Sequence, residues 1–447
     1  MAEPNTQVPG VNDASRPQPS RLYRWVVLIF VSLAMFGNYY VYDCIEPLAD
    51  VLSRQLGFSD QNIGLLQGIY SFPNMFMVLL GGIIVDRIGT RKSIFLFGVL
   101  CLIGSLVTAY PDPIIHLCSL PLSRLWVMAA GRLTFGLGAE SLIVAITCAV
   151  AKWFKGKELS FAFGINLMLA RAGSFLAQFS PSWARSAYGS WHWPLVISVG
   201  FAALCVVGAI IYWALEVNAE RRYELGAGST DKVVWGDIYK FSLSYWYIVA
   251  LCLVFYSAIF PFETFAYKFF MYTHDVTREH AGVLVGMLTL FTMFGTPLFG
   301  LFSDRVGRRA LLMMGGSLLL IPVYLLMAYT HLSLYVPMAM MGIAFALIPA
   351  VMWPSVAYIV EQNKLGTAYG LMTMIQNIGL FGFNVLIGWE NDHAHAGATN
   401  TAGYHPGMWT FSILGFLGLT FAFLLHQRET GPHGHGLETI TARGTAG

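Results

Sequence analysis

Two side chains of opposite charge, Glu140 and Arg171, lie inside long apolar stretches of the chain. A short basic turn joins these stretches, with Glu140 12 residues before Lys152 and Arg171 14 residues after Lys157. The pattern predicts two antiparallel helices, and at about 1.5 Å per residue both charges would lie roughly 18–21 Å below one surface. A bilayer core is about 30 Å thick, so both lie near its middle, where ionisable groups usually mark a pathway or a binding site. Together they can bind a solute that carries both charges.

The composition of the chain indicates a polytopic membrane protein. Of its 447 residues, 56% are hydrophobic and 11% are charged, whereas a soluble domain averages about 25% charged residues. Residues 1–20 are polar and lack the apolar core of a cleavable signal peptide, so we expect the first hydrophobic segment to be retained. A net charge of +2 gives no reason to expect a nucleic-acid partner.

Motifs of enzymes and cofactor sites are missing from the sequence. It has no His-Glu-x-x-His motif and no Gly-x-x-x-x-Gly-Lys-Ser/Thr loop, so we expect neither an enzyme nor an ATP-driven pump. His393, His395, His433 and His435 lie in Gly-rich sequence without a known ligand spacing, so we expect no metal and no cofactor. The six cysteines form no Cys-x-x-Cys pair and are interpreted as free, small hydrophobic residues.

Twelve apolar segments are each near the length of about 20 residues that a membrane-spanning helix needs. They lie near residues 22–52, 61–85, 92–110, 122–151, 158–180, 192–215, 244–271, 280–302, 309–330, 332–360, 364–388 and 406–427. The predicted fold is an all-α membrane protein with twelve transmembrane helices in two pseudo-symmetric six-helix bundles. The bundles would span residues 21–215 and 244–428, joined by a cytoplasmic linker at 216–243, with disordered cytoplasmic ends at 1–20 and 429–447.

The distribution of basic residues predicts the orientation in the membrane. With the N-terminus inside, 19 of the 26 Lys and Arg fall on the cytoplasmic side, and four fall in outer loops: Arg54, Arg124, Arg185 and Arg278. Cytoplasmic loops carry an excess of basic residues, so both termini should be cytoplasmic. The absence of Asn-x-Ser/Thr sequons suits a bacterial plasma membrane.

A short motif, Asp-Arg-x-Gly-x-Arg, occurs once after the second and once after the eighth apolar segment. Its glycine permits a tight turn, while Asp and Arg can cap helix ends or bridge to neighbouring helices. An ordinary basic loop is the alternative, but duplication at matched places in two halves favours a function in conformational coupling within the molecule. The residues concerned are Asp86, Arg87, Gly89 and Arg91 in the first half, and Asp304, Arg305, Gly307 and Arg309 in the second.

These loops resemble the signature of the major facilitator superfamily. The stretch GRLTFGLGAES (Gly131–Ser141) is similar to the superfamily's pattern on its fourth helix. The resemblance implies two six-helix bundles around a central cavity that opens alternately to each side of the membrane. Arg132 belongs to the fourth-helix pattern, and we assign it to conformational coupling, with direct substrate contact as the alternative.

A closer resemblance, from about Arg21 to Arg428, is to the lysosomal dipeptide uniporter branch of this superfamily. It implies a carrier of dipeptides, with a preference for cationic or His-containing ones, in which Glu140 and Arg171 line the substrate cavity. Animal members work with a glycosylated partner subunit, whereas this chain shows no sign of a partner and is expected to function as a monomer. The stretches that carry the resemblance are FGNYYVYD (Phe36–Asp43), YSFPN (Tyr70–Asn74), WFKGKEL (Trp153–Leu159), MLARAGS (Met168–Ser174), FPF (Phe260–Phe262), WPSVAYIV (Trp353–Val360), LGTAYG (Leu365–Gly370) and QNIGL (Gln376–Leu380).

Three charged residues depart from this branch. Glu46 follows Asp43 on the first helix and is expected near the outer surface in contact with solvent. Glu263 and Lys268 are expected near the outer end of the seventh helix, where they would belong to an extracellular gate or form a salt bridge with each other at the rim. These departures leave the range of substrates open.

A zwitterionic peptide suggests a role for each central charge. We expect Arg171 to grip the substrate carboxylate and Glu140 to accept from its ammonium group; the alternative is that the two neutralise each other across their helices. Asp43 supplements Glu140 or makes a helix-packing hydrogen bond. The aromatic candidates Tyr70, Tyr256 and Trp353 are cavity walls or core residues.

In the second half, Gln376 and Asn377 lie at mid-depth, where unsatisfied amides are costly, and they bind the peptide amide or a neighbouring helix. The rival function is a proton-coupled carrier of another small solute, such as an organic anion, amino acid, sugar or drug. In that case Glu140 or Asp43 would take up the proton.

Overall fold

The computed structural model describes residues 17–118, 123–154, 158–223, 241–432 and 434–441. Within these ranges the chain is built of helices and turns, without a strand. Ten helices are long and apolar enough to cross a membrane, and a bent pair, Asp60–Val78 with Leu80–Ile88, makes an eleventh. The helix α8 (Leu159–Gln178) lies between α1 and α12 and completes six long units in each half. The predicted all-α fold with two six-helix halves is therefore confirmed.

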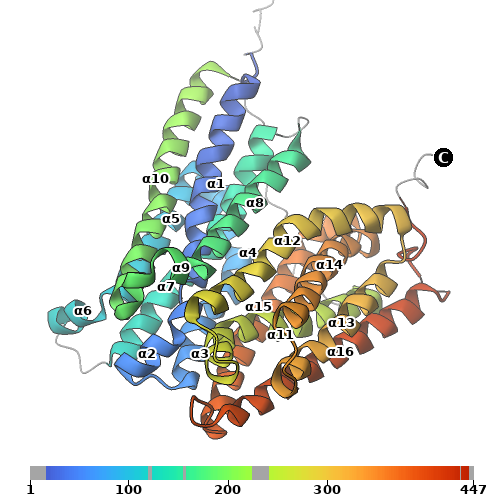
Figure 1. The fold of residues 1–447 in the computed structure, drawn as a ribbon. Coiled ribbons are helices and arrows are strands. Elements are labelled where there is room, and N and C mark those ends of the chain that lie inside the picture. Colours follow the sequence, from blue (N-terminus) through green and yellow to red (C-terminus); the bar gives the residue numbers. More distant parts are fainter. Residues whose placement is uncertain (1–16, 119–122, 155–157, 224–240, 433, 442–447) are drawn as a thin grey trace, which may run out of the picture.

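The helices form two bundles that are joined in a V shape (Figure 1). Its first arm holds residues 21–222 and its second arm holds residues 243–429. The long elements of the first arm are α1 (Arg21–Asp43), α4 (Ser71–Ile88), α5 (Thr90–Ala109), α7 (Arg124–Phe154), α8 and α10 (His192–Arg222). Those of the second arm are α11 (Leu243–Thr273), α12 (Arg278–Val306), α13 (Arg309–Tyr329), α14 (Tyr335–Ile359), α15 (Leu365–His393) and α16 (His405–Glu429).

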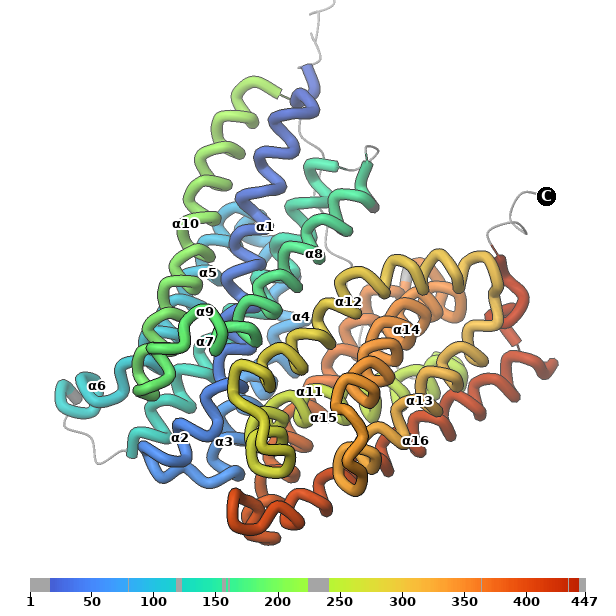
Figure 2. The backbone as a smooth tube through the Cα atoms, viewed as in Figure 1, coloured from blue at the N-terminus to red at the C-terminus, as the bar shows by residue number. Residues whose placement is uncertain are grey.

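Short helices gather at one end of the molecule, which we call the outer end; the end that carries Arg21 and Glu429 is the inner end. They are η1 (Glu46–Leu48), α2 (Ala49–Leu56), α3 (Asp60–Gly68), α6 (Pro111–Cys118) and α9 (Ser180–Trp183). Local sequence explains the breaks, because Gly57 ends α2 with φ 70° and Ser59 caps α3 by accepting from the Asn62 amide. The bundles meet at this outer end and diverge toward the inner end (Figure 2).

Glycines allow the two bundles to approach closely at the outer end. A Cβ on Gly64 of α3 would lie 2.1 Å from the Asn384 carbonyl of α15, and one on Gly388 of α15 would lie 2.4 Å from the Asp60 carbonyl. These distances are far below van der Waals contact. Only glycine therefore permits the observed contact of α3 with α15.

The duplicated motif forms the turns between α4 and α5 and between α12 and α13. Gly89 and Gly307 both have positive φ, 84° and 67°, which confirms the turn that the glycines predict. Arg91 pairs with Glu220 at the end of α10 at 2.5 Å, and Arg309 pairs with Asp304 at 3.1 Å. Each turn is thus bonded within its own bundle.

The segment after α16 is ordered, which corrects the expectation of disorder from residue 429 for the part that the structure describes. Glu438 caps α13, because its carboxylate accepts from the Ala310 amide at 2.8 Å and its carbonyl accepts from the Arg308 amide at 3.0 Å. Leu437 is fully buried. The polar composition of this segment predicted disorder. The segment is held in place because it accepts hydrogen bonds from the first amides of α13, which would otherwise be unpaired. In addition, α10 runs to Arg222, seven residues beyond the predicted end of its segment.

Replacing Gly388 with alanine should destabilise the protein by about 1–3 kcal/mol, because the added methyl group overpacks the contact with α3. Gly382 on the same helix is the matched control, since a Cβ there meets nothing within 4 Å. Thermal unfolding of the purified variants in detergent measures the difference. Equal midpoints for Gly388→Ala and Gly382→Ala would contradict this account of the interface.

Candidate functional site

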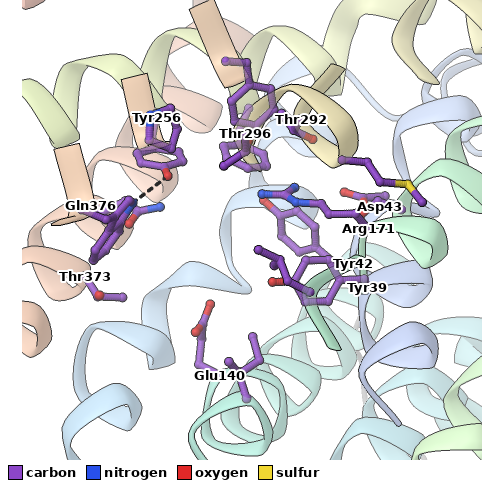
Figure 3. A pocket seen from close by; sticks show the side chains of 18 of the residues that line it. Tyr39, Tyr42, Asp43, Glu140, Arg171, Tyr256, Thr292, Thr296, Thr373 and Gln376 are labelled. Atoms are coloured by element: carbon purple, nitrogen blue, oxygen red, sulfur yellow. Dashed lines mark hydrogen bonds between the residues drawn. The ribbon is translucent and has the colours of Figure 1, made fainter. Parts of the chain in front are cut away.

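A cavity of about 660 Å³ lies between the two bundles near their middle. Helices of both halves line it, and Figure 3 shows their polar side chains pointing into the same space. Every residue that the sequence analysis selected for substrate binding is in its wall: Asp43, Tyr70, Glu140, Arg171, Tyr256, Trp353, Gln376 and Asn377. The structure thus brings together all eight candidates from both halves, and their role in binding remains a prediction.

Arg171 reaches into the cavity from α8. Its guanidinium carbon lies 5.8 Å from the ring centre of Tyr39 and 5.6 Å from that of Phe345, in cation–π contact with both. In Figure 3 it lies below Thr292 and Thr296, with Asp43 beside it. Among the described residues, no carboxylate forms an ion pair with Arg171. The alternative in which it is neutralised by Glu140 is not what this conformation shows.

Glu140 enters the same cavity from α7, on another side from Arg171 (Figure 3). Its carboxylate accepts a hydrogen bond from the Tyr70 hydroxyl at 3.2 Å. The Tyr70 ring packs against Tyr42 and Phe135, with ring centres 4.7 and 5.4 Å away, and these contacts fix the hydroxyl. Glu140 is therefore oriented by a neutral donor, and its carboxyl group faces the cavity where a ligand can reach it.

The second half contributes aromatic and amide groups. The Trp353 indole donates to the Tyr256 hydroxyl at 3.0 Å, and the Tyr369 hydroxyl donates to the Trp353 carbonyl at 3.1 Å. Asn377 donates its side-chain amide to the Thr373 carbonyl of its own helix at 3.0 Å, while its Oδ1 is buried without a partner among the described residues. Gln376 has a long contact of 3.9 Å with the Cys252 thiol. These groups leave acceptors and an aromatic surface facing the cavity.

The sequence analysis did not select Asn38, Thr292, Thr296 and Thr373, which also line the cavity. Asn38 resembles Asn377, because its Nδ2 donates to the Ala139 carbonyl at 3.2 Å while its Oδ1 is buried without a partner among the described residues. The signal for Asn38 was present, since it is an amide inside an apolar run. The sequence could not identify the threonines as cavity residues, because a threonine in a helix commonly donates to a carbonyl of its own helix, as Thr292 does to Thr289.

Two expectations about the outer charges are wrong. Glu46 is fully buried and does not contact solvent, because η1 turns it inward between the bundles. Lys268 does not pair with Glu263; it forms its ion pair with Asp60 of the other bundle and contacts the Ser53 hydroxyl at 3.1 Å. The two residues are five positions apart on α11, so their side chains point to different sides of the helix.

Ion pairs and hydrogen bonds across the two bundles close the outer end. Besides Lys268–Asp60, Arg278 pairs with Asp50, and Asp392 accepts from the amides of Asp60 and Gln61 at 2.8 and 2.9 Å. At the inner end, the ion pairs of the described residues stay within one bundle, as in Lys152–Glu216. The cavity is therefore closed on the outer side in this conformation, while the bundles part toward the inner side (Figure 2).

Arg132 is buried outside the cavity wall and joins two helix ends. Its guanidinium donates to the carbonyls of Val41, Tyr42 and Leu66 at 2.8, 3.1 and 3.2 Å, and to the Gln67 side chain at 2.8 Å. These acceptors lie at the last turns of α1 and α3, where a positive charge also complements the helix dipole. Arg132 thus fixes the end of α1 that carries Asp43. Its predicted role in conformational coupling stays a prediction, now with these contacts to support it.

In the part of the chain that the structure describes, no three His, Cys, Asp or Glu side chains are placed to hold a metal ion. Two of the histidines considered for a metal have different outcomes. His435 pairs with Glu429 at 2.9 Å, and His433 lies outside the described ranges.

The fold and the cavity define a membrane carrier built from two similar halves. Comparison of the sequence with family models gives a match to the Major Facilitator Superfamily over residues 31–383 and 264–440. The chain belongs to this superfamily, and it is a transporter and not an enzyme.

Relatives and solved structures agree with this assignment. The chain is 30% identical to the lysosomal dipeptide transporter MFSD1 of Danio rerio over 378 residues, which cover 82% of this chain and 80% of the relative. It is 30% identical to that of Homo sapiens over 382 residues, 83% and 80% of the two chains. A galacturonate transporter of Dickeya chrysanthemi is 26% identical over 48% of this chain and 58% of its own.

Among solved structures, a bacterial homologue of the human lysosomal transporter Spinster, inward-facing and occupied, superposes with a TM-score of 0.69. It is 18% identical and covers 92% of this chain and 98% of its own. The nucleoside transporter NupG superposes with a TM-score of 0.67 at 15% identity, covering 90% and 99% of the two chains. At these identities the likeness shows the fold alone.

Replacing Arg132 with lysine should lower the free energy of unfolding by about 2–4 kcal/mol, because one ammonium group cannot serve the four acceptors of the planar guanidinium. Arg124→Lys is the control, since Arg124 forms a half-exposed ion pair with Asp112. Denaturation of both variants in the same detergent measures the effect. Unchanged stability of Arg132→Lys would show that the contacts at the ends of α1 and α3 carry little energy.

Proposed function

We propose that this chain moves dipeptides, zwitterionic or cationic, across a membrane by alternating access, as a uniporter. The observation that carries the proposal is the pair Glu140 and Arg171, which face one cavity with no ion-pair partner for either among the described residues. Unpaired charges within a membrane are costly. A ligand with both an ammonium and a carboxylate group would satisfy both at once.

The chemistry of each group fits one part of a dipeptide. The guanidinium of Arg171 offers a planar fork that binds a carboxylate through two parallel hydrogen bonds. Glu140, oriented by Tyr70, accepts from the ammonium group. The unpartnered carbonyl oxygens of Asn38 and Asn377 are acceptors for a peptide N–H group. The surface of Trp353 and Tyr256 can contact apolar atoms of a side chain.

Relatives support the substrate class. The relatives that this chain matches over most of its length carry the name lysosomal dipeptide transporter. Their shared identity of about 30% covers both halves, and the cavity is built from both halves. Because a single chain supplies the whole cavity and the outer closure, we propose that a monomer is functional.

The arrangement of contacts supports alternating access. The outer end is held by ion pairs between bundles, whereas the motif turns bond within their own bundles. Each bundle can therefore move as a unit when the outer pairs part, which is the basis for assigning conformational coupling to the duplicated motif. We propose that both termini are cytoplasmic, because basic residues are in excess at the inner end. The absence of Asn-x-Ser/Thr sequons supports a bacterial plasma membrane.

A proton-coupled carrier of another small solute is the second candidate. It is favoured by one observation, that Glu140 faces the cavity and forms no ion pair with a cation of the described residues. The partial likeness to the galacturonate transporter points in the same direction.

Replacing Arg171 with alanine should abolish dipeptide uptake into proteoliposomes, and Arg171→Lys should reduce it by about tenfold or more, because the bidentate grip is lost (~1.4 kcal/mol per factor of ten). Glu140→Gln should weaken uptake in the same way. Arg124→Ala, a surface ion-pair variant, is the control and should transport normally. Normal uptake by folded Arg171→Ala would exclude the proposed carboxylate site.

Binding should also stabilise the purified protein, by about 2.7 kcal/mol at a ligand concentration of 100 Kd. A thermal-shift screen with dipeptides, free amino acids, sugars and uronic acids compares the substrate classes directly. Dipeptides should raise the unfolding midpoint of the wild type and leave that of Arg171→Ala unchanged. Stabilisation by uronic acids alone would favour the second candidate.

Downhill dipeptide movement should occur in proteoliposomes without a pH gradient, and a pH-sensitive dye inside should record no proton flux. The reason is that a uniporter needs only the gradient of its substrate. Movement of protons together with substrate would contradict uniport and support the second candidate.

A further inference from the structure

Three buried carboxyl groups lie together where the cavity meets the outer closure. Asp43 ends α1, Glu46 lies in η1, and Glu263 lies on α11 of the other bundle; their exposed fractions are 2%, 0% and 1%. Asp43 is within electrostatic reach of Glu46, and both are within reach of Glu263. We call these three residues the carboxyl cluster. It spans the interface between the bundles.

Among the described residues, the cations within reach of this cluster are fewer than its carboxyl groups. Arg132 is bonded to three backbone carbonyls and Gln67, while Lys268 and Arg278 are paired with Asp60 and Asp50. Arg171 is within reach of Asp43 and Glu263, and Arg132 is within reach of Asp43. The other ionisable groups that face the cluster from the surrounding helices are phenols and a thiol, which are neutral at ordinary pH: Tyr39, Tyr42, Cys44, Tyr267 and Tyr324.

A second observation concerns the hydrogen bonding of Glu46. One of its oxygens, Oε1, is buried without a partner in the described chain, and the other accepts from Gln178 at 3.4 Å. The Gln178 side chain cannot turn freely to donate to Oε1 of Glu46, because the Gln178 carbonyl oxygen accepts from the Thr289 hydroxyl at 2.6 Å. An ionised carboxylate with an orphan oxygen in such a site would cost several kcal/mol. A proton on the carboxyl group would remove this cost and give the buried oxygen a hydrogen to donate.

We propose that the carboxyl cluster binds protons when the outer end closes, so that acidity on the outer side favours the outward-closed conformation. Closure brings Glu46 and Glu263 from opposite bundles into one dry interface, and at least one carboxylate oxygen takes up a proton from the outer water. When the bundles part at the outer end, water returns to both glutamates and the proton leaves to the same water.

This proton site is compatible with uniport. Glu46 and Glu263 are not in the wall of the cavity, although Asp43, which contacts Glu46, is; in the proposal the proton resides on the glutamates. It enters and leaves on the outer side only, and no net proton flux results. The site thus adds a regulatory ligand to the alternating-access carrier and does not depend on what the substrate is.

Linkage fixes the sign and size of the expected effect. The closed conformation binds more protons than the open one, so raising the outer pH shifts the equilibrium toward the open conformation. The limiting change in the open-to-closed ratio is about tenfold per pH unit for each proton taken up. Substitution of glutamine, which is neutral at every pH, should remove this dependence.

The experiment measures conformation without substrate. Thiol-reactive spin labels are placed at two exposed outer positions, Leu117→Cys on the first bundle and Leu332→Cys on the second, in a Cys118→Ser background in lipid nanodiscs. Distance distributions are recorded from pH 5 to pH 8. In the wild-type cluster, the long-distance population should rise at least tenfold across this range.

Glu46→Gln and Glu263→Gln together should keep the short distance at all pH values, and each alone should flatten the response. Glu390→Gln is the matched control, since this outer glutamate is bonded to Thr410 within its own bundle; it should respond as the wild type does. A wild type without pH response, or a double variant with the wild-type response, would overturn the proposal. Because no substrate is used, either result is distinguishable from a failure of the dipeptide assignment.

Discussion

The cost of holding charge inside a membrane is the constraint on which the rest of this structure depends. The chain meets it in two ways. At the outer end, charges from opposite bundles neutralise each other, as Lys268 and Asp60 do. In the central cavity, Glu140 and Arg171 are each supported by aromatic neighbours, and neither forms an ion pair within the part of the chain that the structure describes. The first arrangement holds a conformation, and the second leaves a site that a ligand can complete.

Much of this arrangement could be predicted, because hydropathy reports how long a helix is and the rise per residue reports how deep a side chain lies. Glu140 and Arg171 were placed at one depth by counting residues, and the structure puts both in one cavity. The duplicated glycine motif predicted two turns, and the positive φ of Gly89 and Gly307 confirms them. Helix length, the depth of a side chain in the membrane and the residues of a turn depend on local sequence, so they can be predicted from sequence alone.

Contacts between distant segments could not be predicted in the same way. Depth does not fix the rotation of a helix about its axis, so a pair between Lys268 and Glu263 on one helix stayed open as an alternative, whereas the partner of Lys268 is on α3. Glu46 was assigned to the surface, because the inward turn at η1 follows from packing between bundles. The ordered tail was missed for a related reason, since a polar segment such as the one with Glu438 is stabilised only by the helix end that it caps.

The two electrostatic arrangements explain why binding and movement depend on each other under the proposed function. Closing the inner end of an empty carrier buries Glu140 and Arg171 with no counter-charge, which costs free energy in a low dielectric and makes this step slower than the same step with substrate bound. A bound zwitterion supplies a counter-charge to each, so the inner end closes more readily once the cavity is occupied. Closure there must be accompanied by separation at the outer end, where the bundles are joined by Lys268–Asp60 and Arg278–Asp50. Substrate charge at the centre can therefore compensate for ion pairs lost at the rim, and a neutral solute of the same size lacks that compensation.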